Sequence, residues 1–208
     1  MSIADIATDP VADLPLPLLP SNVLGRLSLE QYHDMIRTGI LTENDPYELW
    51  EGVLVRKMPK SPAHCLAIEL VAQALTSRLP GGWHVDAQQS LTLLRSEPEP
   101  DAMVVRGARR DYADRHPGGS DLALVVEVSD SSLDNDRGFK RELYARAGVP
   151  IYWIVNLIDR RVEVFADSGG KAAVFDYRSA QVFAEADDVP LIIGGREVSR
   201  VPVAELLP

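Results

Sequence analysis

The feature that most constrains the fold is a single acidic residue inside an apolar run. Residues 121–129 read DLALVVEVS, with the length and the β-branched content of a buried strand. Because side chains alternate along a strand, Val125, Glu127 and Ser129 share one face, and the residues between them share the other. A carboxylate is costly to bury unless it is paired, hydrogen-bonded or bound to a metal ion. Glu127 therefore needs a partner.

Asp101 is the first candidate partner, because it follows a proline and opens the apolar stretch 101–106. If this stretch pairs antiparallel with 121–129, the start of one strand lies beside the end of the other, and Asp101 comes close to Glu127. Two adjacent carboxylates repel unless a cation lies between them, and such oxygen ligands suit Mg²⁺ or Mn²⁺. The main-chain carbonyl of Val128 is a candidate third ligand. Taken alone, an aspartate after a proline is more often a turn residue.

Lys140 lies thirteen residues after Glu127, on the next predicted helix. A helix that follows a buried strand packs back onto the sheet, and Tyr144 shares a face with Lys140. We expect Lys140 to orient an attacking water or to stabilise charge on a phosphoryl group, and Asp136 and Arg137 to orient Lys140 or a phosphate. The alternative, equally open from the residues, is a buried Glu127–Lys140 ion pair that only fixes helix to strand.

Predicted helices and strands alternate along the chain, which indicates a mixed sheet flanked by helices. No domain boundary is visible within 27–208, so we predict one domain there, preceded by a proline-rich arm at 1–26. Short strands and a final helical turn are expected after residue 166. The other predicted elements are capped helices after Ser28 and Ser61, a helix at 135–147, and strands at 47–58, 83–94, 101–106, 121–129, 151–156 and 161–166.

The net charge of −10 and the pI of about 4.8 disfavour non-specific duplex binding, in which Lys and Arg neutralise phosphates. Carboxylates that await a cation add negative charge of their own, and a local basic strip can coexist with an acidic whole. No apolar run approaches the roughly 20 residues of a membrane helix, and no secretory signal is visible. With the lone Cys65 unable to form an internal disulfide, a cytoplasmic location is predicted.

Five segments of the chain carry a specific pattern. They are YELWEG at 47–52, SPAH at 61–64, EPEPDAMVV at 97–105, LALVVEVSDSS at 122–132 and DRGFKRELYARAGVPIYWIVN at 136–156. These segments resemble the Uma-two family, a bacterial family of restriction-endonuclease-like proteins. The resemblance covers about residues 27–165, and the last two segments together are the most specific. It implies the restriction-endonuclease-like fold, a mixed β-sheet flanked by α-helices, here with additional C-terminal strands.

The resemblance also implies an active site of the PD-(D/E)XK type. Asp101 matches the aspartate of the first element, and Glu127 matches the acid of the second. Ser129 stands where that motif has lysine, and Lys140 matches a lysine that has moved to the following helix. Glu48 matches an acidic position near the family's site, where it binds a second metal ion or orients water. The alternative for Glu48 is a solvated strand residue.

Two further polar residues are weaker candidates for the same site. His64 lies near the start of its helix, where it can contact a phosphate or a water on the metal; a surface or packing histidine is the commoner case. Gln89 is placed on the strand before Asp101, and polar residues on that strand can line such sites.

Three readings of function remain open from the sequence. The first is a Mg²⁺- or Mn²⁺-dependent endonuclease that hydrolyses phosphodiester bonds in DNA. Cutting both strands needs two active sites, so a homodimer is predicted. The second, favoured by the acidic charge, is a catalytically silent homodimeric binding or regulatory module that retains the fold. The third is a metal-dependent hydrolase of small phosphorylated molecules, disfavoured because no phosphate-cradling glycine loop is present.

Overall fold

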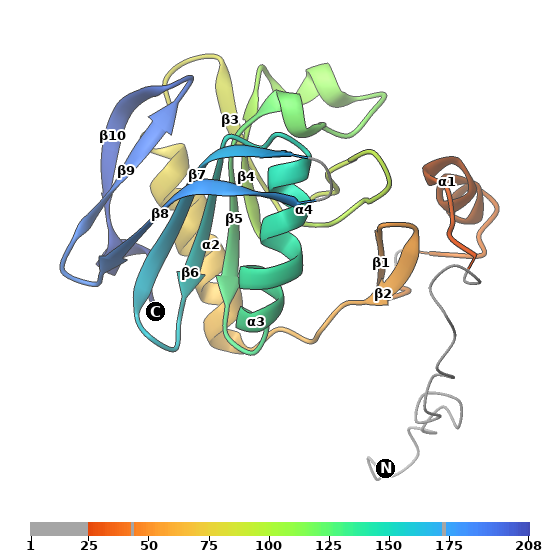
Figure 1. Cartoon of the computed structure of the whole chain (residues 1–208), viewed down its shortest axis with the longest axis horizontal. Coiled ribbons are helices and arrows are strands. Elements are labelled where there is room, and N and C mark those ends of the chain that lie inside the picture. Colours follow the sequence, from red (N-terminus) through yellow and green to blue (C-terminus); the bar gives the residue numbers. More distant parts are fainter. Residues whose placement is uncertain (1–24, 43, 172–173) are drawn as a thin grey trace, which may run out of the picture.

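The computed structural model describes residues 25–42, 44–171 and 174–208. A six-stranded sheet with the order β3-β4-β5-β6-β7-β8 forms its centre (Figure 1). Strands β5 and β6 run parallel, and the other neighbouring pairs in this sheet run antiparallel. The strands of the central sheet are β3 (Trp83–Ala87), β4 (Ala102–Arg106), β5 (Leu122–Ser129), β6 (Ile151–Asn156), β7 (Arg161–Lys171) and β8 (Val174–Ala184).

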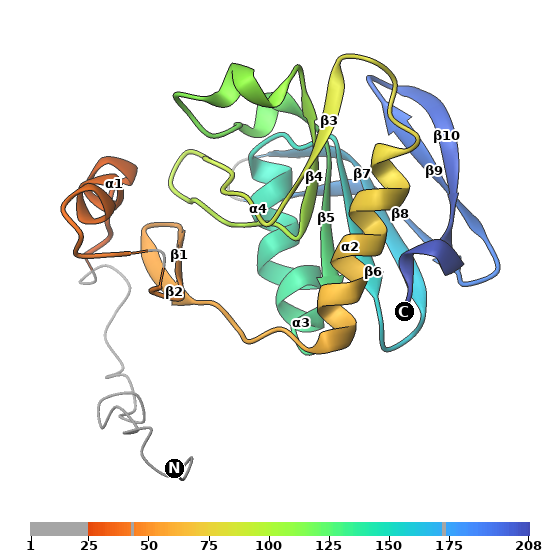
Figure 2. The ribbon, with the colours of Figure 1, turned by 180° about the vertical axis from the view of Figure 1, so that it is seen from behind.

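Helices cover both faces of this sheet (Figures 1 and 2). Helix α2 (Pro62–Thr76) lies on one face, and a nearly continuous helix lies on the other. Val126 and Val128 pack on the α2 side, whereas Val125 packs on the other side, which confirms the predicted alternation along β5. The second helix is made of α3 (Leu133–Asn135), a π-helical turn (Asp136–Lys140) and α4 (Arg141–Arg146).

Two small hairpins flank the central sheet. The strands β1 (Tyr47–Trp50) and β2 (Val53–Arg56) form one hairpin, and β9 (Asp188–Ile193) and β10 (Arg196–Pro202) form the other. The first hairpin is joined to the loop before β4, because the Glu97 N–H donates to the Leu49 carbonyl at 2.7 Å. The second packs with the α2 side of the core, as does the final turn Val203–Leu206.

The predicted helix starts are confirmed. Ser28 caps α1 (Leu29–Arg37) in a reciprocal arrangement with Gln31. The Ser61 hydroxyl accepts the His64 N–H at 3.2 Å, and a proline occupies the first turn of α2. These caps satisfy N–H groups that a helix start otherwise leaves without partners. The cap on α2 also fixes His64 in the first turn, at the end of the sheet where β4 begins.

The predicted strand 83–94 is too long. Strand β3 ends at Ala87, and Gln88 has a positive φ of 53°, which turns the chain out of the sheet. The segment after it finds other backbone partners, such as the Pro98 carbonyl, which accepts the Leu91 N–H at 2.9 Å. Leu91 and Leu93 are buried as loop residues, so hydrophobicity alone misassigned them to a strand. Gln89 therefore does not lie on a strand.

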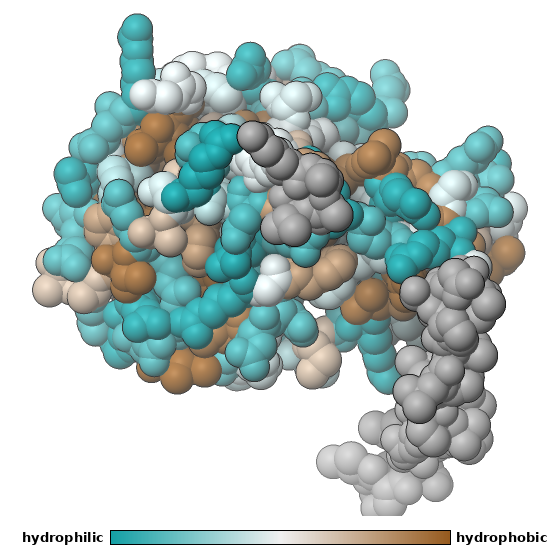
Figure 3. Space-filling view, in the orientation of Figure 1, coloured by the Kyte–Doolittle hydropathy of each residue, from teal (hydrophilic) through white to brown (hydrophobic). Residues whose placement is uncertain are grey.

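The C-terminal part departs from prediction in length, because β7 and β8 each run for eleven residues. The proline-rich arm predicted at 1–26 lies almost wholly outside the described residues, and the single domain at 27–208 stays a prediction. Within the described ranges, no helix is long and apolar enough to cross a membrane. On the face shown in Figure 3, hydrophobic residues form separate patches between hydrophilic ones.

Candidate active site

A cavity of about 340 Å³ opens where the β1–β2 hairpin, the start of α2 and the π-helical turn meet the end of β5. It gathers most of the predicted site residues from segments that are far apart in the sequence. Five carboxylates, three lysines, one arginine and one histidine line it. Glu99 pairs with Lys57 at 2.6 Å, and Arg56 is exposed; seven other titratable side chains remain. These are Glu48, Asp101, Glu127, Asp136, Lys60, Lys140 and His64.

Asp101 and Glu127 meet as the predicted strand pairing requires. Strands β4 and β5 are antiparallel, with Ala102 opposite Val126, so the next residue of each strand extends this pairing. Asp101 is 4% exposed and Glu127 is 2% exposed. A hydrogen bond also ties the Asp101 side chain to β5, because the Val128 main-chain N–H donates to Asp101 Oδ2 at 2.9 Å. The Val128 carbonyl as a ligand stays a prediction.

Both oxygens of Glu127 are held from the helix that covers this face. The Tyr144 hydroxyl donates to Oε1 at 2.6 Å, and the Lys140 ammonium lies 2.9 Å from Oε2. Burial raises the pKa of Glu127 to about 8, and the negative charges of Asp101 and Asp136 add to this rise, so the nearby Lys140 does not cancel it. Glu127 therefore sits where a further positive charge would be favourable.

Lys140 is brought in by the π-helical turn, a local irregularity that is common at functional sites. Its ammonium also lies 3.3 Å from Asp136 Oδ1. Burial alone would lower the pKa of Lys140, but the charges of Glu127 and Asp136 outweigh it and raise the pKa, so the ammonium stays charged. The hydroxyls of Ser129 and Ser132 each donate to Asp136 Oδ2 at 2.6 Å, whereas Oδ1 makes no hydrogen bond. The predicted Glu127–Lys140 ion pair is thus present, and it forms inside the cavity.

Asp101 has a second set of partners on the opposite side of the cavity. The His64 ring and the Lys60 ammonium each lie 3.2 Å from its carboxylate. Burial would raise the pKa of Asp101, but His64, Lys60 and the Val128 N–H together hold it below the ordinary value. Lys60 was missed from the sequence. The available signal was its place directly before the helix cap Ser61, on the loop that positions His64.

Glu48 lines the same cavity from β1 and is not a solvated strand residue, because it is only 9% exposed. The Trp50 indole N–H donates to its Oε2 at 2.7 Å. Burial raises the pKa of Glu48 above its ordinary value, although the Trp50 bond and Lys140 oppose the change. Trp50 lines the cavity, and its ring stacks on Phe139 at 5.1 Å.

Two predicted residues are placed elsewhere. Gln89 lines a separate pocket, which it shares with Arg109 and Tyr112, and its amide lies 3.5 Å from the Ala87 carbonyl. Arg137 does not orient Lys140, because its guanidinium forms a two-pronged bond with Glu163 of β7. The neighbouring Asp136 does meet Lys140, as expected.

A family profile described as Uma2, "Putative restriction endonuclease", matches residues 29–200. The chain belongs to the Uma2 family. The match runs past residue 165, so Uma2 membership extends through most of the C-terminal strands, which the resemblance of the quoted segments had not covered. A search of curated proteins returned no match.

The Uma2 chain also resembles a solved structure, that of "a putative nuclease belonging to DUF820" from Anabaena variabilis. The two share 14% sequence identity over 86% of this chain and 97% of the other, with a TM-score of 0.64. At that identity the likeness concerns the fold. The predicted restriction-endonuclease-like fold, a mixed sheet flanked by helices with additional C-terminal strands, is confirmed.

The charges of this Uma2 cavity fit a divalent cation. With His64 neutral and the other groups ionised, five carboxylates against three ammonium groups and one guanidinium leave one negative charge. Among the residues that the structure describes, no group of three or more His, Cys, Asp or Glu side chains is arranged to hold a metal ion. Mg²⁺ is commonly bound by only one or two carboxylates, with water and substrate phosphates completing its shell. The donor set therefore fits an open Mg²⁺ or Mn²⁺ site better than a structural zinc site.

Proposed function

We propose that this chain is an endonuclease that hydrolyses phosphodiester bonds in DNA and depends on Mg²⁺ or Mn²⁺. The observation that carries the proposal is the buried pair Asp101–Glu127 on neighbouring strands, with the Lys140 ammonium 2.9 Å from Glu127. The description of the Uma2 family as a restriction endonuclease family and the net negative charge of the cavity lining support it.

Each residue has a defined part in this proposal. Asp101, Glu127 and the main-chain carbonyl of Val128 hold the metal ion. A divalent ion bound there supplies Lewis acidity to a phosphoryl oxygen and lowers the pKa of water. Lys140 provides a fixed positive charge beside the place where negative charge develops on phosphorus, at no cost of reorganisation. Tyr144 holds the carboxylate of Glu127 in one orientation.

Residues on the opposite side of the cavity complete the arrangement. His64 and Lys60 hold Asp101 from the start of α2 and the loop before it. With Asp101 engaged by a metal ion, both side chains would be able to contact a phosphate oxygen. Glu48 orients a water molecule or contributes to a second metal position, and the bond from Trp50 keeps its carboxylate in the cavity.

The test is nicking of a supercoiled plasmid by the full chain with Mg²⁺ or Mn²⁺. Cleavage is expected with either ion and is expected to stop with a chelator. Asp101→Asn should remove it, because the variant loses one of the two proposed carboxylate ligands. Equal cleavage by wild type and this variant would contradict the proposal and point to a contaminating nuclease.

A catalytically silent module remains the second candidate, and one observation favours it. The carboxylates of Asp101 and Glu127 already have protein partners, among them His64, Lys60 and Lys140, while the net charge is −10. Calorimetric titration with Mn²⁺ separates the two cases. Heat that disappears in Asp101→Asn supports the nuclease, and absence of heat in wild type supports the silent module.

We also propose that the chain acts as a homodimer, because a cut through both strands of a duplex needs two active sites. Sedimentation equilibrium measures this directly. A monomer at all concentrations would leave nicking of single strands as the expected activity.

A further inference from the structure

The loop at 106–117, between β4 and the turn Gly119–Asp121, has a charge unlike the rest of the chain. It holds four arginines and two aspartates, a net charge of +2, so the remainder of the chain carries −12. Phosphodiester backbones are bound chiefly by such local clusters of positive charge. The charged residues of the loop are Arg106, Arg109, Arg110, Arg115, Asp111 and Asp114.

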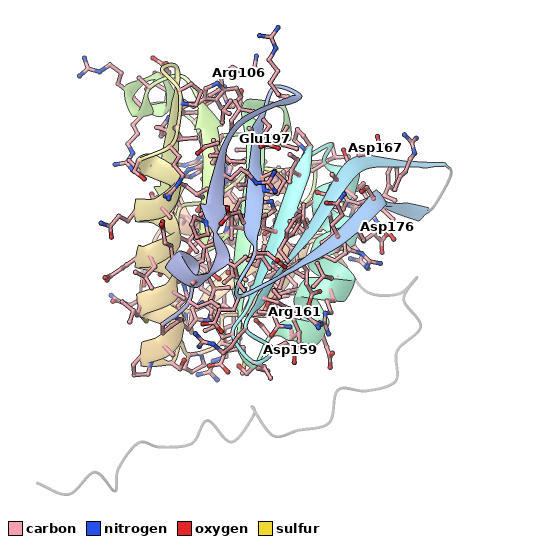
Figure 4. The ribbon with its side chains drawn as sticks, turned by 90° about the vertical axis from the view of Figure 1, so that its left-hand side faces the viewer. Arg106, Asp159, Arg161, Asp167, Asp176 and Glu197 are labelled. Atoms are coloured by element: carbon pink, nitrogen blue, oxygen red, sulfur yellow. The ribbon has the colours of Figure 1, made fainter. Side chains whose placement is uncertain are left out.

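The guanidinium groups of this loop are restrained but face solvent. Arg115 lies over the Tyr112 ring at 4.8 Å, and Arg106 lies over the Trp83 ring at 5.2 Å. Contacts of this kind order the stem of the side chain. Figure 4 shows Arg106 projecting from the end of the sheet opposite the turn that carries Asp159. Within the described residues Arg106 and Arg110 make no ion pair, whereas Arg109 and Arg115 are held by Asp86 and Asp121.

A pocket of about 470 Å³ lies beside the loop. Arg109, Tyr112, Arg115 and His116 line it from the loop side, and the chain that leaves β3 lines it from the other side. The side chains of Arg109 and Arg115 are 72% and 57% exposed. Asp86 also lines the pocket and pairs with Arg109 at 2.9 Å, and Arg115 pairs with Asp121 at 2.7 Å. Ion pairs this close to the surface contribute little, so a phosphate can compete for the two guanidinium groups.

The pocket adjoins the candidate active site along the edge strand β3. The Gln88 N–H donates to the Asp101 carbonyl at 3.3 Å, and Lys60 donates to Gln88 Oε1 at 2.8 Å. At the same edge, Arg109 donates to the Val85 carbonyl at 2.6 Å. The five residues of β3 span about 17 Å. This length corresponds to roughly five base-pair steps of duplex at about 3.4 Å each. One nucleic-acid backbone can thus contact both Lys60 and the loop.

We infer that the 106–117 loop and its pocket bind the phosphodiester backbone of duplex DNA that enters the active site along the β3 edge. The inference rests on the proposed function for the class of substrate, but the binding surface is separate from the catalytic residues. In a chain with a net charge of −10, the attraction to a polyanion rests on Arg106 and Arg110, which have no ion-pair partner within the described residues.

The test is fluorescence anisotropy with a labelled DNA duplex and the full chain in Ca²⁺, over a series of salt concentrations. The double variant Arg110→Gln/Arg115→Gln removes two positive charges of the loop. The matched control, Arg178→Gln/Arg200→Gln, removes two exposed arginines of β8 and β10 that make surface ion pairs with Asp167 and Glu197. Because each phosphate contact contributes about 0.9 to the slope of log K against log salt, we expect the loop variant to lower the slope by about 1.8.

The outcomes separate this inference from the proposed nuclease. A lower slope and weaker binding in the loop variant, with the control unchanged, support the surface. Equal effects in both variants, or none in either, overturn it even if the wild type cleaves plasmid. Binding that depends on the loop in a chain that never cleaves keeps the surface and removes the nuclease. Should the double variant melt early, Arg110→Gln alone is decisive, because no ion pair of Arg110 is present in the described structure.

Discussion

Two glutamates lie in the same row of the central sheet, in two copies of the tripeptide Val-Glu-Val. Glu127 of β5 and Glu163 of β7 both pair with Ile154 of the strand between them, so their side chains share one face. They are 2% and 5% exposed. One helix supplies a cation to each, because Lys140 reaches Glu127 and Arg137 reaches Glu163. Local sequence and burial are nearly the same at both positions.

The surroundings of the two carboxylates differ in charge balance. Glu163 is bound by Arg137, Arg161 and Asn156, and with Asp159 beside them the positive and negative charges are equal. Burial would raise the pKa of Glu163, but these bonds outweigh it and lower the pKa. Figure 4 shows Asp159 and Arg161 together at one end of the sheet. Because the charge of Glu163 is already balanced by protein groups, this carboxylate requires no ligand.

Glu127 has the opposite balance, because Asp101, Asp136 and Glu48 share its cavity, and burial with the charges of Asp101 and Asp136 outweighs Lys140 and raises the pKa of Glu127. A buried carboxylate with compensated charge holds a fold together, whereas one with an excess of like charge and an open cavity is prepared for a ligand. The comparison can be tested by neutralising each glutamate in turn and measuring activity and stability.

The largest expected effect is on cleavage. Glu127→Gln should reduce plasmid nicking with Mn²⁺ by at least about a hundredfold, because a metal ligand and the partner of Lys140 are lost together. Glu163→Gln, the matched change in the same row, should keep activity within about threefold at a temperature where it is folded. Initial rates on supercoiled plasmid measure both. Comparable losses in the two variants would mean that Glu127 has no special role.

In the presence of a chelator, the loss of stability should be larger for Glu163→Gln than for Glu127→Gln, the reverse of the order expected for activity. Glu163→Gln should cost about 2 kcal/mol in the free energy of unfolding, because charge-assisted bonds to two partly exposed arginines are weakened. Glu127→Gln should cost less than about 1 kcal/mol, because it removes one of several crowded carboxylates while Asp136 still pairs with Lys140. Urea unfolding of both variants gives the numbers. A larger loss for Glu127→Gln would show that its ion pair serves mainly stability.

The stability difference at Glu163 should depend on pH in one direction. A pKa lowered below the ordinary value of 4.5 means that the folded state gains stability above that value and loses it as pH falls through the folded pKa. The deficit of Glu163→Gln relative to wild type should be complete at neutral pH and should vanish in acid. Unfolding curves over this range measure it, and a constant deficit would attribute the loss to packing instead of charge.

Much of this arrangement was predictable from the sequence, because local rules act there without competition. The apolar run around Glu127 fixed its strand, and the antiparallel pairing with the strand after Asp101 brought the two acids together. Lys140 and Tyr144 were expected to share a helix face, and both bind Glu127. The resemblance to the family contributed Glu48, which composition and spacing alone did not identify.

The errors have a common physical cause, since they concern partners chosen by tertiary structure. Arg137 was expected at the site, but a two-pronged contact with Glu163 holds it. Gln89 was expected on a strand, but a left-handed Gln88 turns the chain into a different pocket. Lys60 was overlooked because nothing in its local pattern shows that it will reach Asp101. Long polar side chains bridge elements, and only the assembled fold decides which ones.

The smallest expected effect concerns Tyr144, which acts on Glu127 by positioning it. Tyr144→Phe removes the 2.6 Å hydrogen bond to Oε1 and leaves the ring in place, so we expect kcat to fall about tenfold with little change in KM. Tyr152→Phe is the matched control, because Tyr152 is equally buried, lies 5.1 Å from Tyr144 and donates to the Asp136 main-chain carbonyl at 3.2 Å. Each change should cost about 1 kcal/mol of stability. If kcat falls equally in both, the loss reflects general loosening of the core; if only Tyr144→Phe slows cleavage, the orientation of Glu127 itself limits the rate.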